Sequence, residues 1–545
     1  MENLLVTLGH NSSCILVRND EVVCGYEEER LSLIKSDSRF PQLSILKCLE
    51  YSEENVDGIY VSHWFPFGEL PKNPNKYWNP FWIHNYVPGN PTVYSVSADF
   101  THHDSHAHSA IAFCRNEFPT ENAGIIVADG FGNFGECLSI YDITSDKRLQ
   151  IRHRSFGYSD SLGLMYQYTT AFLGMKENQD EYKLLGYEPR AWSMFPTLYD
   201  VITERAIKDG VNQASRLLGS HKIGNKYDPM YAVDALPAIR LKYGLFLNDL
   251  LNDISSVEKL DEYEKKVIIS YYAQRRLEAA IGAIVKESGY KKLILVGGVF
   301  MNVKLNLFLT DMVEKISIMP LAGDQGAAIG LFSAMNAFKW PDHLFWGIRS
   351  LKKPNSKPRN FYHFHSEPVA KHYIIDLLQK NYVVNVVRGA MEFGARSLCH
   401  TSTLALPTQE NVDYINSCNG RDTIMPMAPV ILPEALDTLF DDHNKVIKSL
   451  DYMITALRYR DGSNYTGASN YYPINNVFTG RPQIAREQFI QSILKEVRDG
   501  ILINTSMNEH GMPICYGIND VIRCHVSQLN QDINNRINTV VIDNE

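Results

Sequence analysis

The sequence of 545 residues predicts an α/β fold. Two short apolar segments have the length of buried strands and run directly into glycine turns: Ile125–Ala128 precedes Asp-Gly-Phe-Gly, and Leu293–Val296 precedes Gly-Gly. Between them, Lys265–Glu287 carries apolar residues at helical spacing, and Ser288-Gly289 should end that helix. Strands that end in glycine turns and are separated by helices are typical of α/β architecture.

The N-terminal segment predicts strands followed by a helix. Leu4–Leu8, Cys14–Val17 and Val22–Gly25 are apolar, and the polar residues 18–21 form a turn between the last two. Phe40-Pro41 should open a helix. Its apolar residues are expected on one face: Leu43, Ile45, Leu46 and Leu49.

Composition excludes several classes of protein. The hydrophobic share of 45% and the charged share of 21% are ordinary globular values, and the net charge of −9 argues against indiscriminate binding to DNA or acidic membranes. No apolar run is long enough to cross a bilayer, and no signal peptide is evident, so we expect a cytoplasmic protein without membrane contact. The nine scattered cysteines fit reduced, mostly buried thiols. The charged residues 27–30, followed by Lys35, predict a solvated surface run.

A domain boundary is expected at residues 350–360. This segment is polar, contains proline and lacks hydrophobic periodicity, as linkers do. It would separate an N-terminal part, residues 1–349, from a second domain at residues 361–545.

A histidine cluster predicts a metal site. His102 and His106 are four residues apart, so on a helix they project from one face and can chelate one divalent ion. Asp129 and Asp324 both stand in glycine-rich turns and could supply the remaining oxygen ligands. The alternatives are a histidine-rich helix entry without an ion and turn aspartates that cap the next helix, above all for Asp324.

The glycine turns also predict nucleotide binding, because glycines let the backbone approach a phosphate closely. The candidate residues are Gly130, Gly132, Gly297, Gly298, Asn302 and Gly323. His10, in a loop after the first strand, could act as a general base or could only form local hydrogen bonds.

The second domain carries candidate anion ligands. Arg396, Arg421 and Arg481 are near turns, and the segment that contains Asn504 and Ser506 follows an apolar strand. Arginines together with small polar residues suit a phosphate or carboxylate. Taken singly, each arginine could equally be a surface ion-pair partner.

These motifs, in this order, resemble the ATP-dependent O-carbamoyltransferases, the family that carbamoylates tobramycin, cephamycins and nodulation factors. The resemblance runs from the first strand nearly to the C-terminus. It rests on the segments at residues 9–13, 27–41, 102–107, 129–132, 180–183, 297–302, 323–326, 391–398 and 504–514.

The resemblance implies a fold and a division of labour. Residues 1–349 would form an actin/sugar-kinase-like (ASKHA) double domain, similar to the ligase domain of the tRNA threonylcarbamoyl-modification enzyme, and residues 361–545 a YrdC-like α/β domain. The YrdC-like domain would convert carbamoyl phosphate to carbamate. The double domain would form carbamoyl-adenylate from carbamate and ATP, and a hydroxyl of the acceptor would then displace AMP.

The resemblance also assigns roles to residues. A divalent ion, iron in known relatives and here Fe²⁺ with Mg²⁺ or Mn²⁺ as alternatives, would be bound by His102, His106, Asp129 and Asp324. His10 would deprotonate the acceptor hydroxyl, and Lys35 would stabilise the adenylate. Carbamoyl phosphate would be bound by Arg396, Arg421, Arg481, Asn504 and Ser506.

Two positions depart from the family pattern. Asn419 stands where the family has lysine, and Met425 stands where it has arginine. Each lost charge-assisted hydrogen bond would weaken anion binding by roughly 1.5–3 kcal/mol. The alternatives are therefore a kinase-like phosphotransferase or a non-catalytic nucleotide-binding protein on the same scaffold, although sugar kinases need no histidine-bound ion. The acceptor would be a small molecule, a sugar or a modified nucleotide or nucleobase, with nucleic acid only as acceptor, and a homodimer is a possible assembly.

Overall fold

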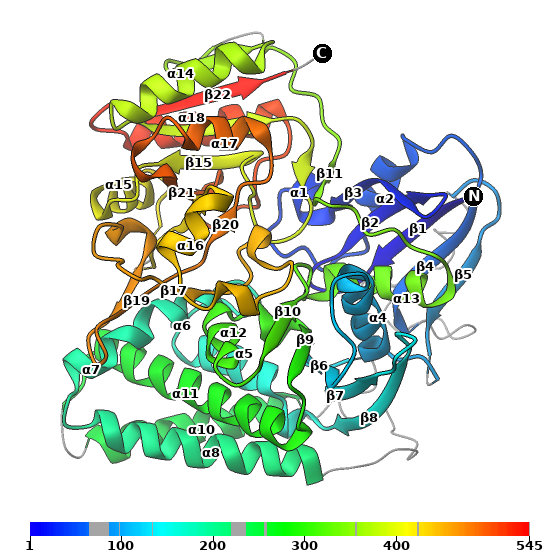
Figure 1. The fold of residues 1–545 in the computed structure, drawn as a ribbon, viewed down its shortest axis with the longest axis vertical. Coiled ribbons are helices and arrows are strands. Elements are labelled where there is room, and N and C mark those ends of the chain that lie inside the picture. Colours follow the sequence, from blue (N-terminus) through cyan, green and yellow to red (C-terminus); the bar gives the residue numbers. More distant parts are fainter. Residues whose placement is uncertain are drawn as a thin grey trace.

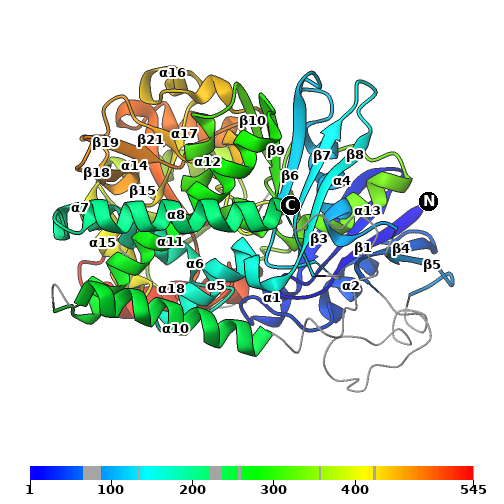
Figure 2. The same ribbon diagram turned by 90° about the horizontal axis from the view of Figure 1, so that it is seen from below.

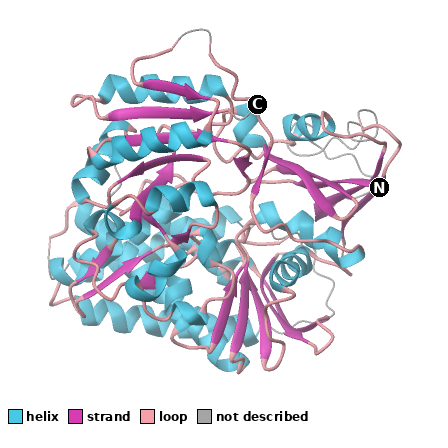
Figure 3. Cartoon of the chain, turned by 45° about the horizontal axis from the view of Figure 1, so that its top comes forward, coloured by secondary structure: helices cyan, strands magenta, loops and turns pink. Residues whose placement is uncertain are grey.

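The computed structural model describes residues 1–64, 87–97, 99–132, 135–219, 236–255, 259–354, 357–421 and 425–543. It confirms the α/β class: sheets are flanked by helices in every part of the chain (Figure 3).

The first sheet is built from the N-terminal strands in the order β3-β2-β1-β4-β5. The strands are β1 (Glu2–Thr7), β2 (Ser13–Arg18), β3 (Glu21–Glu27), β4 (Val56–Trp64) and β5 (Thr92–Val96). The three predicted N-terminal strands are confirmed. The antiparallel pairs are β1 with β2 and β2 with β3, whereas β4 runs parallel to β1 and to β5.

The second sheet repeats this topology. Its order is β10-β9-β6-β7-β8. The strands are β6 (Ala123–Ala128), β7 (Glu136–Ile143), β8 (Leu149–Phe156), β9 (Lys292–Val296) and β10 (Lys315–Ile318). Again the first strand has antiparallel partners on one side and parallel strands on the other. The carboxyl ends of β6 and β9 therefore meet at one edge, where both predicted glycine turns begin.

Two helices pack between these sheets, α4 (His102–Cys114) and α13 (Ala327–Met335) (Figure 1). They share one hydrophobic core with Leu5 of the first sheet and Ile125 of the second. The contact between them is very close, because a Cβ at Gly330 would lie 1.6 Å from the backbone oxygen of Ser105. Only glycine fits there, so this contact fixes the position of α4 relative to α13.

A layer of long helices covers the other face of the second sheet: α8 (Tyr199–Gly219), α10 (Leu236–Ser255) and α11 (Glu262–Ser288) (Figure 2). The predicted helix at residues 265–287 is thus confirmed as α11. It ends as expected at Gly289, which has a φ of 72° and caps the helix in the left-handed conformation.

Two expectations for the N-terminal region are wrong. In α2 (Gln42–Leu49), Leu43 and Leu46 are 41% and 42% exposed, and the buried side is formed by Ser44, Ile45 and Cys48. Nor do the charged residues at 27–30 form a solvated run: Glu27, Glu28 and Arg30 are buried. The carboxylate of Glu28 accepts hydrogen bonds from the backbone N–H groups of Leu43 and Ser44, so it caps α2.

The C-terminal region forms a seven-stranded sheet in the order β12-β22-β13-β15-β21-β16-β20. The strands are β12 (Phe361–Phe364), β13 (Val383–Arg388), β15 (Thr401–Ala405), β16 (Ala428–Ile431), β20 (Gln483–Ile484), β21 (Ile501–Ser506) and β22 (Ile537–Ile542). One face is covered by α14 (Glu367–Gln379) and α17 (Gln488–Leu494), the other by α15 (Gln409–Cys418) and α18 (Ile518–Gln531).

The two parts of the chain are in contact. Strand β11 (Phe345–Gly347) pairs with β14 (Met391–Glu392) across the polar segment at residues 350–360, in which the described residues form no helix or strand. Val446 pairs with Ile316 at the edge of the second sheet. All nine cysteines are buried, as expected. Within the described residues, no helix combines the length and the apolar character that a membrane crossing requires.

Candidate metal centre and anion site

Four side chains from three separate segments converge at the edge where β6 ends. His102 and His106 lie on the first turns of α4, Asp129 follows β6 directly, and Asp324 begins the short 3₁₀ helix Asp324–Gly326. One ligand atom from each of the four lies within 4.8 Å of all the others. The structure therefore brings the predicted metal ligands together.

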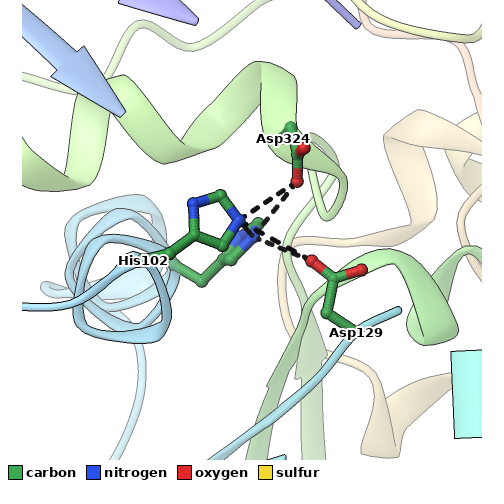
Figure 4. A group of neighbouring side chains, drawn as sticks. His102, Asp129 and Asp324 are labelled. Atoms are coloured by element: carbon green, nitrogen blue, oxygen red, sulfur yellow. Dashed lines mark hydrogen bonds and ion pairs between the residues drawn. The ribbon is translucent and has the colours of Figure 1, made fainter. Parts of the chain in front are cut away.

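The donor atoms face one point (Figure 4). The Nε2 of His106 is 3.3 Å from Asp129 Oδ2, and the Nε2 of His102 is 3.3 Å from Asp324 Oδ1. The two Nε2 atoms are 3.0 Å apart. The side chain of Asp324 caps no helix. Of the two interpretations of this residue, the structure favours the one in which its carboxylate faces the histidines.

The electrostatics of the cluster favour a cation. All four side chains are buried, and burial by itself disfavours every charged form. The opposite charges outweigh this cost: both carboxylates hold the pKa of His102 well above its ordinary value, and the two histidines hold the pKa values of Asp129 and Asp324 low. Two carboxylates that stay ionised in a buried site need a positive partner, which is either a protonated histidine of the cluster or a bound metal ion.

The residues fit a divalent metal ion. The Nδ1 of His102 lies 3.0 Å from the backbone oxygen of Ser62, a bond that fixes the ring and leaves Nε2 facing the cluster. Two imidazole nitrogens and two carboxylate oxygens form a mixed donor set that suits Fe²⁺, Mn²⁺ or Zn²⁺.

A buried ionic network holds the start of α4. Arg154 donates to Asp104, at 2.6 Å, and lies 3.1 Å from Glu136. Asp104 and Thr101 form a capping box, and Glu136 accepts the backbone N–H of His103, at 3.2 Å. Because these contacts surround the first turn, they fix the direction in which the two metal-facing histidines point.

Two more histidines border the cluster. His10, with its side chain 44% exposed, has Nδ1 3.8 Å from Asp324 Oδ2, so it stands between the cluster and solvent. His63 was not predicted; its Nε2 lies 3.9 Å from the same oxygen, and burial together with the charge of His102 lowers its pKa to about 3. The feature that could have identified His63 is its position at the end of β4. This strand runs parallel to β1 and so ends beside the His10 loop.

The predicted nucleotide-binding residues surround the same edge. A Cβ at Gly298 would lie 2.9 Å from Asp129 Oδ1, whereas Gly130 faces open space. Asn302 has its side chain engaged within the protein: it caps α12 (Val303–Thr310) by accepting from Leu305 N, and it donates to Gln274. Gly132 lies against His102 and Glu136, Gly297 against Ala128, and Gly323 against Gln325.

The three predicted arginines lie partly buried in the C-terminal region. Burial lowers the pKa of Arg396 to about 10, and burial together with the charge of Arg396 lowers the pKa of Arg481 to about 9. Arg421 donates to Thr505 Oγ1 and Asn508 Oδ1, both at 2.8 Å. Among the described residues, no carboxylate lies within 4.0 Å of these three guanidinium groups. Uncompensated buried cations of this kind suit an anionic ligand.

The other predicted anion ligands have mixed placements. Ser506 donates to Asn508, beside Arg421, whereas the buried amide of Asn504 donates to Ser397 and Gln483. Burial lowers the pKa of Lys35, and the charges that act on it include those of Glu29, Arg421 and Asp180.

Asn419 and Met425, the two departures from the family pattern, differ in their surroundings. The Asn419 side chain accepts from Gln528, at 2.7 Å, and its buried Nδ2 has no hydrogen-bond partner among the described residues. Met425 packs against a hydrophobic cluster that includes Leu185 and Val303.

Models of known families match two stretches of the chain. The model described as Carbamoyltransferase N-terminus matches residues 93–332, and the model described as Carbamoyltransferase C-terminus matches residues 375–542.

Curated relatives align with much of the chain. MJ1051 of Methanocaldococcus jannaschii, an uncharacterized protein, is 27% identical over 94% of both chains. The nodulation protein NolNO of Sinorhizobium fredii is 25% identical over 95% of this chain and 76% of its own. A 3'-hydroxymethylcephem-O-carbamoyltransferase of Amycolatopsis lactamdurans is 26% identical over 42% of this chain and 45% of its own.

Solved structures give a weaker comparison. A ROK family glucokinase from Streptomyces griseus covers 61% of this chain and 99% of its own at 10% identity, with a TM-score of 0.28. That score is too low to carry an argument about the fold.

Proposed function

Because the chain belongs to the carbamoyltransferase family, we propose that it transfers a carbamoyl group from carbamoyl phosphate to a hydroxyl group of an acceptor, with ATP as co-substrate. The observation that carries the proposal is the convergence of His102, His106, Asp129 and Asp324 on one point. A buried cation site next to glycine turns suits a reaction that must bind and polarise a triphosphate.

The repeated order of the first two sheets supports an actin/sugar-kinase-like double domain in residues 1–349. Residues 361–545 would then be the YrdC-like domain that receives carbamoyl phosphate. Arg396, Arg421 and Arg481 supply the positive charge for its phosphate. There water adds, phosphate leaves, and carbamate remains.

The second and third steps belong to the double domain. A carbamate oxygen bonds to the α-phosphorus of ATP while the bond to pyrophosphate breaks, which gives carbamoyl-adenylate. The acceptor hydroxyl oxygen then bonds to the carbamoyl carbon, and AMP leaves with the electron pair. His10, partly exposed and beside the cluster, takes the hydroxyl proton at its ring. Lys35, whose charge is acted on by both Asp180 and Arg421, can neutralise the carboxylate or phosphate charge of the adenylate.

A divalent ion bound by the four ligands would neutralise phosphate charge during adenylation. Of the ions that this donor set suits, we propose Fe²⁺, with Mn²⁺ as the alternative and Mg²⁺, which prefers oxygen ligands, as a further one. The protein itself holds the ligands in place through the contacts of α4 and excludes water around them, since all four side chains are buried.

The acceptor is proposed to be a hydroxyl-bearing small molecule, a sugar or a modified nucleotide or nucleobase. The cephem relative, named for carbamoyl transfer to a 3'-hydroxymethyl cephem, supports a hydroxymethyl group as acceptor chemistry. Asn419 and Met425 remove two charges that the family pattern would bring to the donor phosphate. We therefore expect weaker binding of carbamoyl phosphate than the family pattern would give.

The test is a radiolabelled pyrophosphate exchange assay, which needs no acceptor. Label should enter ATP only when carbamoyl phosphate and a divalent ion are both present. When candidate acceptors are then added, a true acceptor should yield AMP and a carbamoylated product. Formation of ADP as the only nucleotide product would identify a kinase-like phosphotransferase instead, and ATP binding without any exchange would favour a non-catalytic protein.

A further inference from the structure

We propose that Glu27 and Arg30 bind the backbone of Gly394 and thereby hold the loop of Arg396 in a fixed position relative to the histidine–aspartate cluster. We call this pair of residues the clamp. The clamp thereby couples carbamoyl phosphate breakdown to adenylation. The coupling rests on the proposed function, and the clamp itself rests on geometry. Both are positioning residues.

The two side chains bind both the backbone oxygen and the backbone N–H of Gly394. Arg30 donates from Nε and Nη2 to Glu27 Oε2, at 3.1 and 2.9 Å, and its Nη2 also donates to the backbone oxygen of Gly394, at 2.7 Å. Gly394 returns the contact, because its N–H donates to Glu27 Oε2 at 3.1 Å. The Arg30 and Glu27 side chains are only 3% and 6% exposed, so these bonds are shielded from water.

Gly394 fits this place only as glycine. Its φ is +104°, a conformation that side chains rarely adopt, and a Cβ would lie 2.7 Å from Leu321 Cδ2. Leu321 precedes Asp324 by three residues. Gly394 therefore packs against the loop that carries Asp324, one of the four proposed metal ligands.

The loop beyond Gly394 is closed by hydrogen bonds to Glu392. Glu392 Oε1 accepts three backbone N–H groups, from Leu398, His400 and Thr401, which closes the chain around Arg396. A shift of Gly394 would thus be passed to the Arg396 guanidinium, whose buried Nε has no hydrogen-bond partner of its own in the described structure.

On the N-terminal side, the clamp connects to the loop of Lys35. Arg30 Nη1 lies 3.5 Å from Glu29 Oε1, and Glu29 Oε2 accepts the backbone N–H of Ser36 at 2.7 Å. The same helix, α1 (Glu28–Ser32), starts with a bond from Glu28 N to the backbone oxygen of Ser12, two residues after His10. One short helix therefore contacts the His10 loop, the Lys35 loop and the Arg396 loop.

Coupling matters because carbamate is unstable in water and has to pass from one site to the other. A buried ion pair contributes little net stability, since desolvation offsets its attraction, but it can fix one arrangement of the groups around it. Here that arrangement joins two domains. Loss of the clamp should let carbamate escape between the sites while the phosphate-releasing residues stay intact.

The test uses a double variant, Glu27→Gln with Arg30→Met, which leaves no unpaired charge buried. The matched control is Glu2→Gln with Arg18→Met, because Arg18 Nε and Glu2 Oε1 form a 2.6 Å pair in the same sheet without reaching the C-terminal domain. Two rates are measured in the presence of carbamoyl phosphate, ATP and Mn²⁺: phosphate release and pyrophosphate exchange into ATP.

We expect the ratio of exchange to phosphate release to fall at least about tenfold in the clamp variant and to stay at the wild-type value in the control. A merely structural role would lower both rates together, and an unchanged ratio overturns the coupling. If the wild-type protein shows neither rate, the proposed function fails, and the clamp is then judged by hydrogen exchange alone.

Hydrogen exchange of the full chain needs no turnover. The Gly394 amide donates to a buried carboxylate, so peptides covering residues 391–398 should be protected in the wild type. Protection there and at residues 33–37 should drop in the clamp variant, while residues 13–18 keep theirs. Unchanged protection at residues 391–398 overturns the clamp.

Discussion

The Nε2 atoms of His102 and His106 lie 3.0 Å apart, a separation at which two ring nitrogens need a proton or a cation between them. Both face Asp129 and Asp324 as well. The pair is held at the start of α4 by the ionic network of Arg154, and α4 is fixed by its close contact with α13. The geometry of the candidate cation site thus depends on the helix packing and the ionic contacts of the residues between the two histidines.

Removal of one imidazole should remove the metal. His102→Ala takes away one of four donors, and we expect metal content per chain to fall at least tenfold, with loss of pyrophosphate exchange. Phosphate release from carbamoyl phosphate should persist, because the arginines belong to the region of the seven-stranded sheet, away from the cluster. Elemental mass spectrometry and the two assays check this. His108→Ala, on the same helix, is the control; full metal content in His102→Ala would contradict the ligand set.

Replacing Arg481 should separate stability from activity. Its buried guanidinium has no carboxylate partner among the described residues, so Arg481→Met should raise the melting temperature of the ligand-free protein. The same change should raise the KM for carbamoyl phosphate about 10- to 100-fold, the equivalent of one charge-assisted contact. Arg486→Met, at a position with 60% exposure and an ion pair to Asp451, is the control for both readouts. A lower melting temperature of Arg481→Met would show that a partner in the folded protein already balances the charge of Arg481.

Glu278 should make stability depend on pH. Burial, partly opposed by Arg275, raises its pKa from 4.5 to about 7. Between those values the folded protein keeps a proton that the unfolded chain releases, so the contribution of this group to stability falls as pH rises from 4.5 to 7. Glu278→Gln cannot lose that proton. The stability of Glu278→Gln relative to wild type should therefore increase across this window, by at most about 3 kcal/mol.

Chemical denaturation at pH 5 and pH 8 measures this difference. Glu262→Gln changes an 84% exposed carboxylate on the same helix and should leave the relative stability equal at the two pH values. An equal result for Glu278→Gln would show that Glu278 is ionised throughout.

Gly394→Ala should destabilise the protein more than Gly174→Ala does. Both glycines have positive φ, +104° and +75°, but only Gly394 has a neighbour, Leu321, within reach of a Cβ. The strained backbone costs about 1–2 kcal/mol in both variants, and overlap adds roughly 1–3 kcal/mol at Gly394. Equal unfolding free energies in urea would show that Leu321 moves aside freely.

Local sequence patterns predicted the structure correctly where residues that are close in sequence are also close in space. The hairpin strands, the long helix ended by Gly289 and the spacing of His102 and His106 all depend on contacts within a few residues. The face of α2 was predicted wrongly for the converse reason. The helix packs on the first sheet through Ile45 and Cys48, and Glu28 of α1 caps its start beside Ser44. Hydrophobic spacing alone pointed to Leu43 and Leu46, which are exposed.

The sequence by itself determined the α/β class, the strands that end in glycine turns, the family and the residue types able to bind a cation. Only the tertiary structure decided that His63 borders the cluster and that Glu27 and Arg30 are buried against Gly394. The reason is physical. A charged side chain has no fixed role until the fold sets its distance to water and to other charges, and these partners lie hundreds of residues away along the chain.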